Sequence, residues 1–303
     1  MNLVLQAARS QAGVLAELTK LRIQGVAIPA ALAAQWLAQG ERLLPGPALA
    51  LSAGLFLTCS GAACLNQVLE ADTDALMERT RSRPIPSGRV RRESALVFGL
   101  LACALGVSWF SWMVGPLAAW LALAMVVLYD FVYTPLKRIT PLNTAVGAVP
   151  GALPVLIGWA AAGKGLDPVA WTLFGILFLW QFPHFMAIAW LHREDYERAG
   201  LRMVTARGIA RRVSGQRALS YALALVPVSL LPTLNGGAGR LYFYGALVLS
   251  LLFLLFALRF SLAVQTPEGT PAPRARGLLH ASLLYLPLLF ALLIADSAMA
   301  ASP

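Results

Sequence analysis

Four acidic residues and three arginines lie within one short stretch, residues 66–86. The acids are Glu70, Asp72, Asp74 and Glu78, which are four of only 14 acidic residues in the chain. They directly follow the apolar run 48–65. Because carboxylates are costly beside hydrocarbon, acids at the end of an apolar run indicate a functional site.

The spacing of these polar residues predicts a metal site. On a helix, residues four apart share a face, so Asn66, Glu70 and Asp74 would form a ladder of oxygen ligands about 12 Å long. Asp72 would point to nearly the opposite side, and we expect it to support the site only indirectly. Oxygen ligands with no histidine or cysteine nearby are typical of Mg²⁺, which binds through a few carboxylates and substrate phosphates.

The arginines of the same stretch have two interpretations. Arg79, Arg81 and Arg83 could form a positive loop that caps a membrane helix. That interpretation accounts for the arginines but not for the acids. A metal ion together with several guanidinium groups is suited to a diphosphate, whose charge both neutralise.

The elements that position these residues are predicted to be membrane helices. The chain has 303 residues, of which 58% are hydrophobic and 13% charged, and its mean hydropathy is +0.69. These values are typical of an integral membrane protein. Because the apolar runs are continuous and do not alternate, they favour helices over a barrel. We expect one all-α domain over residues 1–303, a bundle of about nine transmembrane helices around a central cavity open to the cytoplasmic side. The predicted spans are 21–38, 48–70, 94–113, 115–134, 143–163, 170–191, 218–234, 240–260 and 277–296.

The placement of charge predicts the orientation of these spans. The net charge is +10, but the cations gather on one side of the predicted membrane, which argues against nucleic acid as a partner. Of 24 lysines and arginines, all but Arg42, Lys164 and Arg240 fall on the side of the N-terminus and the even-numbered loops, which leaves 21 there. The positive-inside rule therefore predicts a cytoplasmic N-terminus and an outside C-terminus. Anionic membrane lipid is a second expected partner of these cations.

The N-terminal segment suggests the membrane in which the chain resides. It shows neither a removable signal peptide nor an Arg-rich and Ser-rich transit segment, so we expect a bacterial plasma (inner) membrane. The three cysteines all fall inside apolar spans without pairing or metal-ligand spacing, and we expect small buried side chains.

Further polar residues lie at other predicted helix ends. Lys137 and Arg138 belong to a predicted short cytoplasmic loop, 130–143, where they either set the topology or face the same pocket as the arginines. Arg22 either anchors the first helix by snorkelling or contacts an anionic ligand. The following span, 143–163, is rich in glycine and proline, which favours close helix packing.

The sixth span ends in a second polar group. His184, His192 and Asp195 follow helical spacing and can share a face. His184 is either a packed hydrogen-bonding residue or a substrate ligand. Asp195 lies at the same side of the membrane as Asp74, so we expect the two acidic clusters to converge on one pool of Mg²⁺.

These motifs together resemble the UbiA-type intramembrane prenyltransferases. The matching elements are Asn66 with acids four and eight residues on, the following Arg-Thr and Arg-Pro pairs, and Tyr133 with Lys137 in a Tyr-x-x-x-Lys element. Asn143 and Pro183-His184-Phe185 are similar to the protohaem IX farnesyltransferase (haem O synthase) branch. Two departures are Glu70, where many members have Asp, and Glu194-Asp195, which lacks the spaced Asp pair of the wider superfamily.

The resemblance implies an enzyme that transfers the farnesyl group of farnesyl diphosphate to a vinyl group of haem B, with water addition, to give haem O. It implies that Asn66, Glu70, Asp74 and Asp195 hold Mg²⁺. It implies that Arg22, Arg79, Arg83, Tyr133, Lys137 and Arg138 bind the diphosphate. It implies that Asn143, His184 and His192 bind the acceptor. Downstream haem-modifying or oxidase-assembly proteins are partners of the kind that this reaction would serve.

Two alternatives remain open at this point. A prenyltransferase for an aromatic or quinone-precursor acceptor would share every diphosphate residue and differ only in the acceptor pocket. A membrane transporter or haem-handling protein without chemistry would instead distribute polar residues along a path across several spans. The gathering of polar residues at one face of the membrane favours the enzyme.

Overall fold

All regular secondary structure in the described part of the chain is helical. The computed structural model describes residues 11–40, 44–202, 210–265 and 271–300. The principal helices are α2 (Leu21–Ala38), α3 (Pro45–Asp74), α4 (Arg92–Met113), α5 (Pro116–Val126), the π-helix η1 (Val127–Tyr133), α6 (Thr134–Ile139), α7 (Asn143–Ala160), α8 (Pro168–Leu191), α9 (Arg193–Arg198), α10 (Ala210–Leu234), α11 (Arg240–Gln265) and α12 (Pro271–Ala300).

The observed helices confirm the predicted all-α membrane fold. Each of the nine predicted spans coincides with one long helix or, for the fourth span, with α5 and η1. Among the described residues, eight helical segments are long and apolar enough to cross a bilayer, and α2 is the predicted span that is not among them. Helix α3 continues to Asp74, four residues beyond its predicted end, so the whole polar ladder lies on one regular helix.

The prediction of a loop from Asp130 is wrong. Residues up to Ile139 are helical, because η1 leads directly into α6 and only residues 140–142 connect α6 to α7. Pro135 interrupts nothing, since it occupies the first turn of α6, where a missing backbone N–H is tolerated. Tyr133 and Lys137 therefore lie one turn apart on a helical rod, and the π-helical turn is of the kind often found at functional sites.

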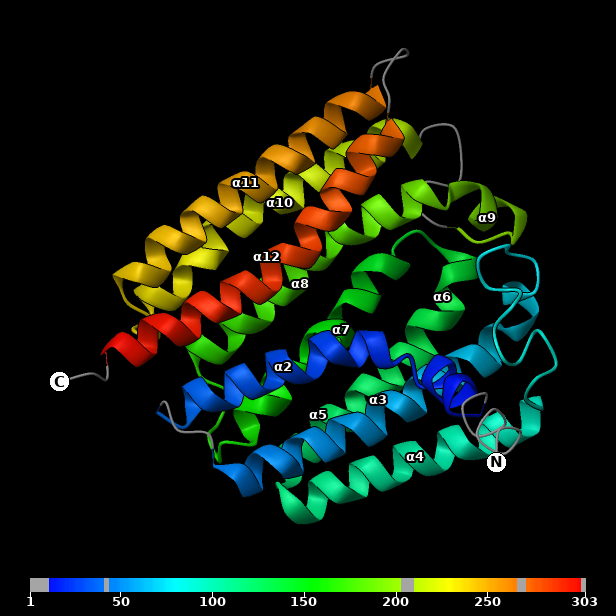
Figure 1. Ribbon diagram of the computed structural model, residues 1–303, viewed down its shortest axis with the longest axis horizontal. Coiled ribbons are helices and arrows are strands. Elements are labelled where there is room, and N and C mark those ends of the chain that lie inside the picture. Colours follow the sequence, from blue (N-terminus) through cyan, green and yellow to red (C-terminus); the bar gives the residue numbers. More distant parts are fainter. Residues whose placement is uncertain (1–10, 41–43, 203–209, 266–270, 301–303) are drawn as a thin grey trace, which may run out of the picture.

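The helices form two groups that meet along the middle of the molecule. Helices α8, α10, α11 and α12 pack together on one side, and α3, α4 and α5 on the other, with α2 and α7 between them (Figure 1). Close approaches depend on glycine, as expected for the span 143–163. A Cβ at Gly158 would collide with the backbone of Ala31 on α2, and a Cβ at Gly61 would lie 2.6 Å from the backbone nitrogen of Cys103 on α4.

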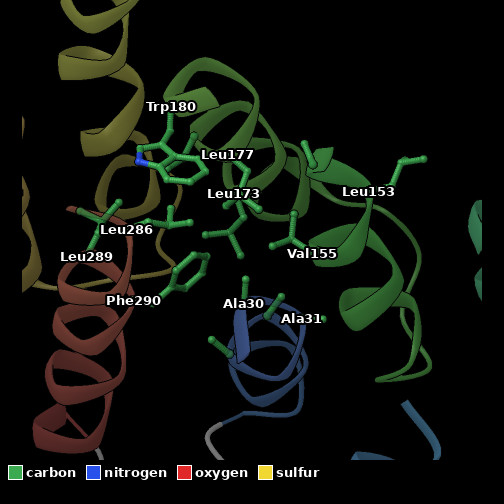
Figure 2. Packing of buried hydrophobic residues seen from close by; sticks show 14 of the residues in the cluster. Ala30, Ala31, Leu153, Val155, Leu173, Leu177, Trp180, Leu286, Leu289 and Phe290 are labelled. Atoms are coloured by element: carbon green, nitrogen blue, oxygen red, sulfur yellow. The ribbon is translucent and has the colours of Figure 1, made fainter. Parts of the chain in front are cut away.

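A buried apolar layer joins the two groups. Figure 2 shows Leu173 and Trp180 of α8 facing Leu286 and Phe290 of α12, with Ala30 of α2 beside them. Ala30 lies nine residues, or about 14 Å of helix, from the N-terminal end of α2. That end of α2 points toward the end of the bundle that also holds α6, α9 and the segment between α3 and α4 (Figure 1).

Candidate active site

Three residues of α3 meet three cations from three different elements. Lys20 directly precedes α2, and its Nζ lies 2.6 Å from Asn66 Oδ1 of α3. Lys137 Nζ of α6 lies 2.6 Å from Glu70 Oε1, and Arg83 Nη1 of the α3–α4 segment lies 2.7 Å from Asp74 Oδ2. The predicted ladder of Asn66, Glu70 and Asp74 is therefore present on one helix face, and it is matched position by position with positive charge.

The ion pairs in this cluster are largely buried, so the charges interact strongly. The side chain of Asp74 is 1% exposed, and those of Glu70 and Lys137 are both 13% exposed. Asp74 also lies in the last turn of α3, where the partial negative charge of the helix end disfavours a carboxylate. Arg83 therefore compensates both the carboxylate and the helix end.

Asp72 lies outside this cluster, as the helical spacing predicts. Its side chain is 75% exposed and lies 3.3 Å from Arg92 Nη1, on the side of α3 that faces α4. Asp72 and Asp74 thus lie on the same helix turn, but the carboxylate of Asp72 is exposed and that of Asp74 is buried.

The helical rod of η1 and α6 is fixed against α3 by side-chain hydrogen bonds. Thr134 Oγ1 accepts a hydrogen bond from Asn66 Nδ2 at 2.9 Å and donates to the Tyr129 carbonyl at 2.9 Å. Lys137 Nζ lies 4.4 Å from the centroid of the Tyr133 ring, a cation–π contact. Gly147 of α7 makes room for that ring, because a Cβ there would lie 2.6 Å from it.

Lys20 enters the cluster through an unusual backbone conformation. Its φ of 49° and ψ of 50° are left-handed, and it is the one non-glycine residue with positive φ in the described ranges. This conformation costs a non-glycine residue about 1–3 kcal/mol and is concentrated at functional sites. Burial and the positive charge of Arg83 lower the pKa of Lys20 to about 7, although Glu70 opposes them, and an anionic ligand beside the amine would favour its charged form.

Arg22, the cation expected here, does not reach the cluster. Its side chain is exposed on α2 and makes no hydrogen bond or ion pair in the part of the chain that the structure describes. Both cations stand in the segment Thr19-Lys20-Leu21-Arg22, so their residue types do not distinguish them. The left-handed turn at Lys20, which no sequence pattern signals, decides which of the two faces α3.

The segment between α3 and α4 docks against α9. Asp195 accepts a hydrogen bond from the backbone N–H of Glu78 at 3.2 Å. Arg79 donates to the Tyr196 hydroxyl at 3.2 Å and lies 5.6 Å from the centre of its ring. Met77 packs with Tyr196 in the same buried apolar cluster. The ends of α3 and α8 are thus joined by this segment, and Arg79 contacts Tyr196.

The carboxylates themselves do not gather into one group. Within the described ranges, no set of three or more histidine, cysteine, aspartate or glutamate side chains is arranged to hold a metal. Asp195 lies instead 3.6 Å from Arg198 on its own helix. The donors that fit Mg²⁺ are therefore the oxygens of the α3 ladder, which suit an ion that binds through one or two carboxylates and completes its shell with water and substrate phosphates.

The remaining predicted residues lie at three separate places. Arg138 is exposed and hydrogen-bonded to Thr73 on α3. The amide of Asn143 is fully buried and donates to the carbonyls of Thr140 and Arg202, so it joins two chain segments. His192 caps the end of α8, where burial and nearby Arg79 lower its pKa.

His184 lies further along α8, two helical turns before His192. Its Nδ1 is 2.7 Å from Ser282 Oγ of α12, and its ring stacks on Trp180. The three residues expected to bind the acceptor, Asn143, His184 and His192, thus have different surroundings and do not form one cluster.

One buried carboxyl was missed by the sequence reasoning. Asp130 on η1 has no exposed surface, and neither of its carboxyl oxygens has a hydrogen-bond partner among the described residues. Its position in an expected loop concealed it. The signal that could have found it is an acid four residues before Thr134 within an otherwise apolar run.

The sequence of this chain was compared with protein families and with known proteins. Residues 26–273 match the UbiA prenyltransferase family. The chain is 47% identical over 246 residues to a protein from Solibacter usitatus named protoheme IX farnesyltransferase, which covers 80% of this chain and 81% of that protein. A protein of the same name from Koribacter versatilis is 39% identical over 284 residues, 92% of each chain.

Solved structures share the fold at low sequence identity. A structure described as digeranylgeranylglyceryl phosphate synthase matches with a TM-score of 0.77 at 16% identity, over 96% of this chain and 99% of that chain. A UbiA homologue from Archaeoglobus fulgidus, solved with GPP and Mg²⁺, matches with a TM-score of 0.65 at 15% identity, over 92% and 99%. With its eight candidate spans, this chain is a multi-pass membrane protein. It belongs to the UbiA prenyltransferase family.

Proposed function

We propose that this chain transfers the farnesyl group of farnesyl diphosphate to a vinyl group of haem B, with addition of water, to give haem O and diphosphate. The observation that carries the diphosphate half of this reaction is the array of Lys20, Lys137 and Arg83 along Asn66, Glu70 and Asp74. The observation that supports haem as the acceptor is the name of the relatives at 39–47% identity.

The difficult step is loss of the diphosphate. The bond between farnesyl C1 and the diphosphate oxygen breaks, and the electron pair leaves with the diphosphate. Negative charge therefore develops on that oxygen in the transition state, so cations held nearby accelerate the step. Lys20, Lys137 and Arg83 are such cations, and each is held by a partner on α3.

The α3 oxygens have a second role in this proposal. Asn66, Glu70 and Asp74 are the ligands that we assign to Mg²⁺, which supplies further positive charge to the diphosphate when bound. We assign Asp195 to the same site only through the segment that it anchors, since its hydrogen bond to the Glu78 backbone holds residues 75–83 beside the end of α3. Tyr133 orients Lys137, and Arg79 and Arg138 fix the surrounding segments.

The later steps concern the acceptor. The terminal vinyl carbon of haem forms the new bond to farnesyl C1, which leaves positive charge on the vinyl carbon next to the porphyrin ring. Water adds there and one proton is released. The apolar helices around the site protect the allylic cation from earlier attack by water.

The location follows from the same features. The diphosphate site lies at the end of the bundle that carries most of the lysines and arginines, which corresponds to the cytoplasmic side by the positive-inside rule. The N-terminus is then cytoplasmic and the C-terminus outside. We propose the plasma membrane of a bacterium, with haem-modifying or oxidase-assembly proteins downstream.

Product mass tests the proposal. The purified chain is incubated with Mg²⁺, farnesyl diphosphate and haem B, and in parallel with an aromatic quinone precursor in place of haem. We expect a haem product heavier by a farnesyl group plus water, and no change in the aromatic compound. Prenylation of the aromatic compound with unmodified haem would contradict the acceptor assignment while leaving the diphosphate site intact.

A further inference from the structure

A hydrogen bond joins His184 of α8 to Ser282 of α12. Nδ1 of His184 lies 2.7 Å from Ser282 Oγ, although the two residues are 98 positions apart in the chain. Ser282 has no exposed surface, whereas His184 is half-buried. The imidazole ring is therefore held from one edge by a buried partner.

The hydroxyl proton of Ser282 is already committed. Ser282 Oγ also lies 2.6 Å from the carbonyl oxygen of Leu279, which can only accept a hydrogen bond. A serine hydroxyl has one proton to donate, so Ser282 donates to Leu279 and accepts from His184. His184 Nδ1 then carries the ring proton, and Nε2 of the neutral ring has a free lone pair.

Trp180 restricts the plane of the same ring. The Trp180 and His184 rings stack with centroids 5.0 Å apart and an angle of 21° between their planes. Trp180 is itself fixed to Ser282, because its Nε1 donates to the Ser282 backbone carbonyl at 2.8 Å. Figure 2 shows the Trp180 ring between α8 and the facing residues of α12.

Nε2 of His184 has no hydrogen-bond partner among the described residues. It is also not among the unpartnered side-chain atoms that are completely buried, so it keeps some accessible surface. A half-buried histidine with one nitrogen satisfied and the other free has the arrangement of a metal ligand, in which the distal ring nitrogen is oriented by a hydrogen bond.

We propose that Ser282 is a positioning residue that holds His184 in the tautomer presenting Nε2 to the iron of the haem substrate. This inference rests on the proposed function, because it takes haem as the acceptor. Ser282 touches neither haem nor diphosphate in this account. It acts through the protonation and orientation of the His184 ring, in the way that partners of metal-bound histidines act in metal sites.

Haem binding with an optical readout tests this role. The full chain in detergent is titrated with ferric haem B, and the absorption and EPR spectra report ligation of the iron by imidazole. Ser282→Ala removes the hydroxyl but keeps the backbone carbonyl that Trp180 uses. Ser282→Thr keeps the hydroxyl. Ser297→Ala is the matched control, because Ser297 is also buried on α12 and also donates to a carbonyl of its own helix, that of Leu293.

We expect a histidine-ligated spectrum in the wild type, in Ser282→Thr and in Ser297→Ala. We expect Ser282→Ala to weaken haem binding about 10–100-fold and to change the ligation spectrum, as loss of such a partner does in metal sites. His184→Ala should remove that spectrum. The farnesyl diphosphate concentration that gives half-saturation of binding should be the same in all of these variants. An unchanged value would show that each variant keeps its fold.

Two outcomes would overturn the inference, and they are distinguishable. If wild-type protein binds haem and Ser282→Ala gives the same spectrum and affinity as Ser297→Ala, Ser282 does not position a haem ligand and the acceptor assignment stands. If wild-type protein binds no haem but still consumes farnesyl diphosphate with another acceptor, the proposed function itself is wrong and this inference falls with it.

Discussion

Lys137 of α6 and Glu70 of α3 form an ion pair of 2.6 Å in which both side chains are largely buried. The two residues are 67 positions apart, and the pair brings the Tyr-x-x-x-Lys element onto the polar ladder of α3. A buried pair of this kind is costly to break on one side only, because the remaining charge is left without compensation. Here the pair holds Lys137 at the position where we propose that it neutralises the charge of the diphosphate.

Substitutions in this pair can distinguish its contribution to catalysis from its contribution to stability. We expect Lys137→Met to lower kcat about 10²–10³-fold, as loss of a preorganised charge at a reacting oxygen does. It should also lower the free energy of unfolding by about 3–5 kcal/mol, because Glu70 is left buried and unpaired. Thermal unfolding and turnover are measured for Lys137→Met, Glu70→Gln and the double variant, which together form a double-mutant cycle.

The double variant should regain most of the stability and none of the activity. Recovery of turnover in the double variant would show that Lys137 acts on Glu70 alone and not on the substrate.

A matched pair of substitutions tests the role of the left-handed residue at the start of α2. Lys20→Met removes a cation that lies 2.6 Å from Asn66 Oδ1, whereas Arg22→Met removes an exposed cation two residues away. We expect Lys20→Met to reduce kcat/KM for farnesyl diphosphate about 100-fold, since a charge-assisted contact with a developing anion is lost. Arg22→Met should be close to wild type in the same steady-state assay. The reverse order would place Arg22 on the diphosphate and Lys20 outside it.

The glycine behind Tyr133 should be sensitive to a single added methyl group. A Cβ at Gly147 would lie 2.6 Å from the Tyr133 ring, so Gly147→Ala pushes the ring that contacts Lys137. We expect a loss of about 1–3 kcal/mol in stability and, because a shift of about 1 Å in a catalytic group can reduce the rate about 100-fold, a clear loss of turnover.

Gly25→Ala is the control for that substitution, because a Cβ there would meet nothing within 4 Å. Equal turnover of the two alanine variants would mean that the Tyr133 ring has room to move without consequence.

Removal of divalent metal tests the assignment of the α3 oxygens. We expect a chelator to stop haem farnesylation and added Mg²⁺ to restore it, because the carboxylates of α3 bind a diphosphate only through a cation. The optical spectrum of bound haem should not change during the treatment. Undiminished turnover in the chelator would contradict the metal role.

Much of this architecture could be predicted from the sequence, because the polar ladder depends on local helical spacing. Asn66, Glu70 and Asp74 lie on one face for the same reason that Asp72 lies on another, and continuous apolar runs indicate the helices. The Tyr133–Lys137 segment was harder, because the π-helical turn of η1 and the position of Pro135 turn an apparent loop into a rod.

Other features depend on long-range packing and leave no local signal. The choice of Lys20 over Arg22 is set by one backbone turn, and the hydrogen bond between Ser282 and His184 connects helices that are distant in the chain. The convergence of Asp74 and Asp195 was expected as a shared metal site. The structure instead joins the two regions through the backbone of Glu78 and the side chain of Arg79.

Asp74→Asn and Asp72→Asn give the most direct comparison for the central claim that the α3 ladder drives loss of the diphosphate. The two substitutions make the same chemical change two residues apart, on a buried carboxylate paired with Arg83 and on an exposed one paired with Arg92. The measurement is the rate of diphosphate release with Mg²⁺, farnesyl diphosphate and haem B. The account predicts a loss of at least about 100-fold in Asp74→Asn with the fold retained, and a rate near wild type in Asp72→Asn. An unchanged rate in Asp74→Asn would contradict it.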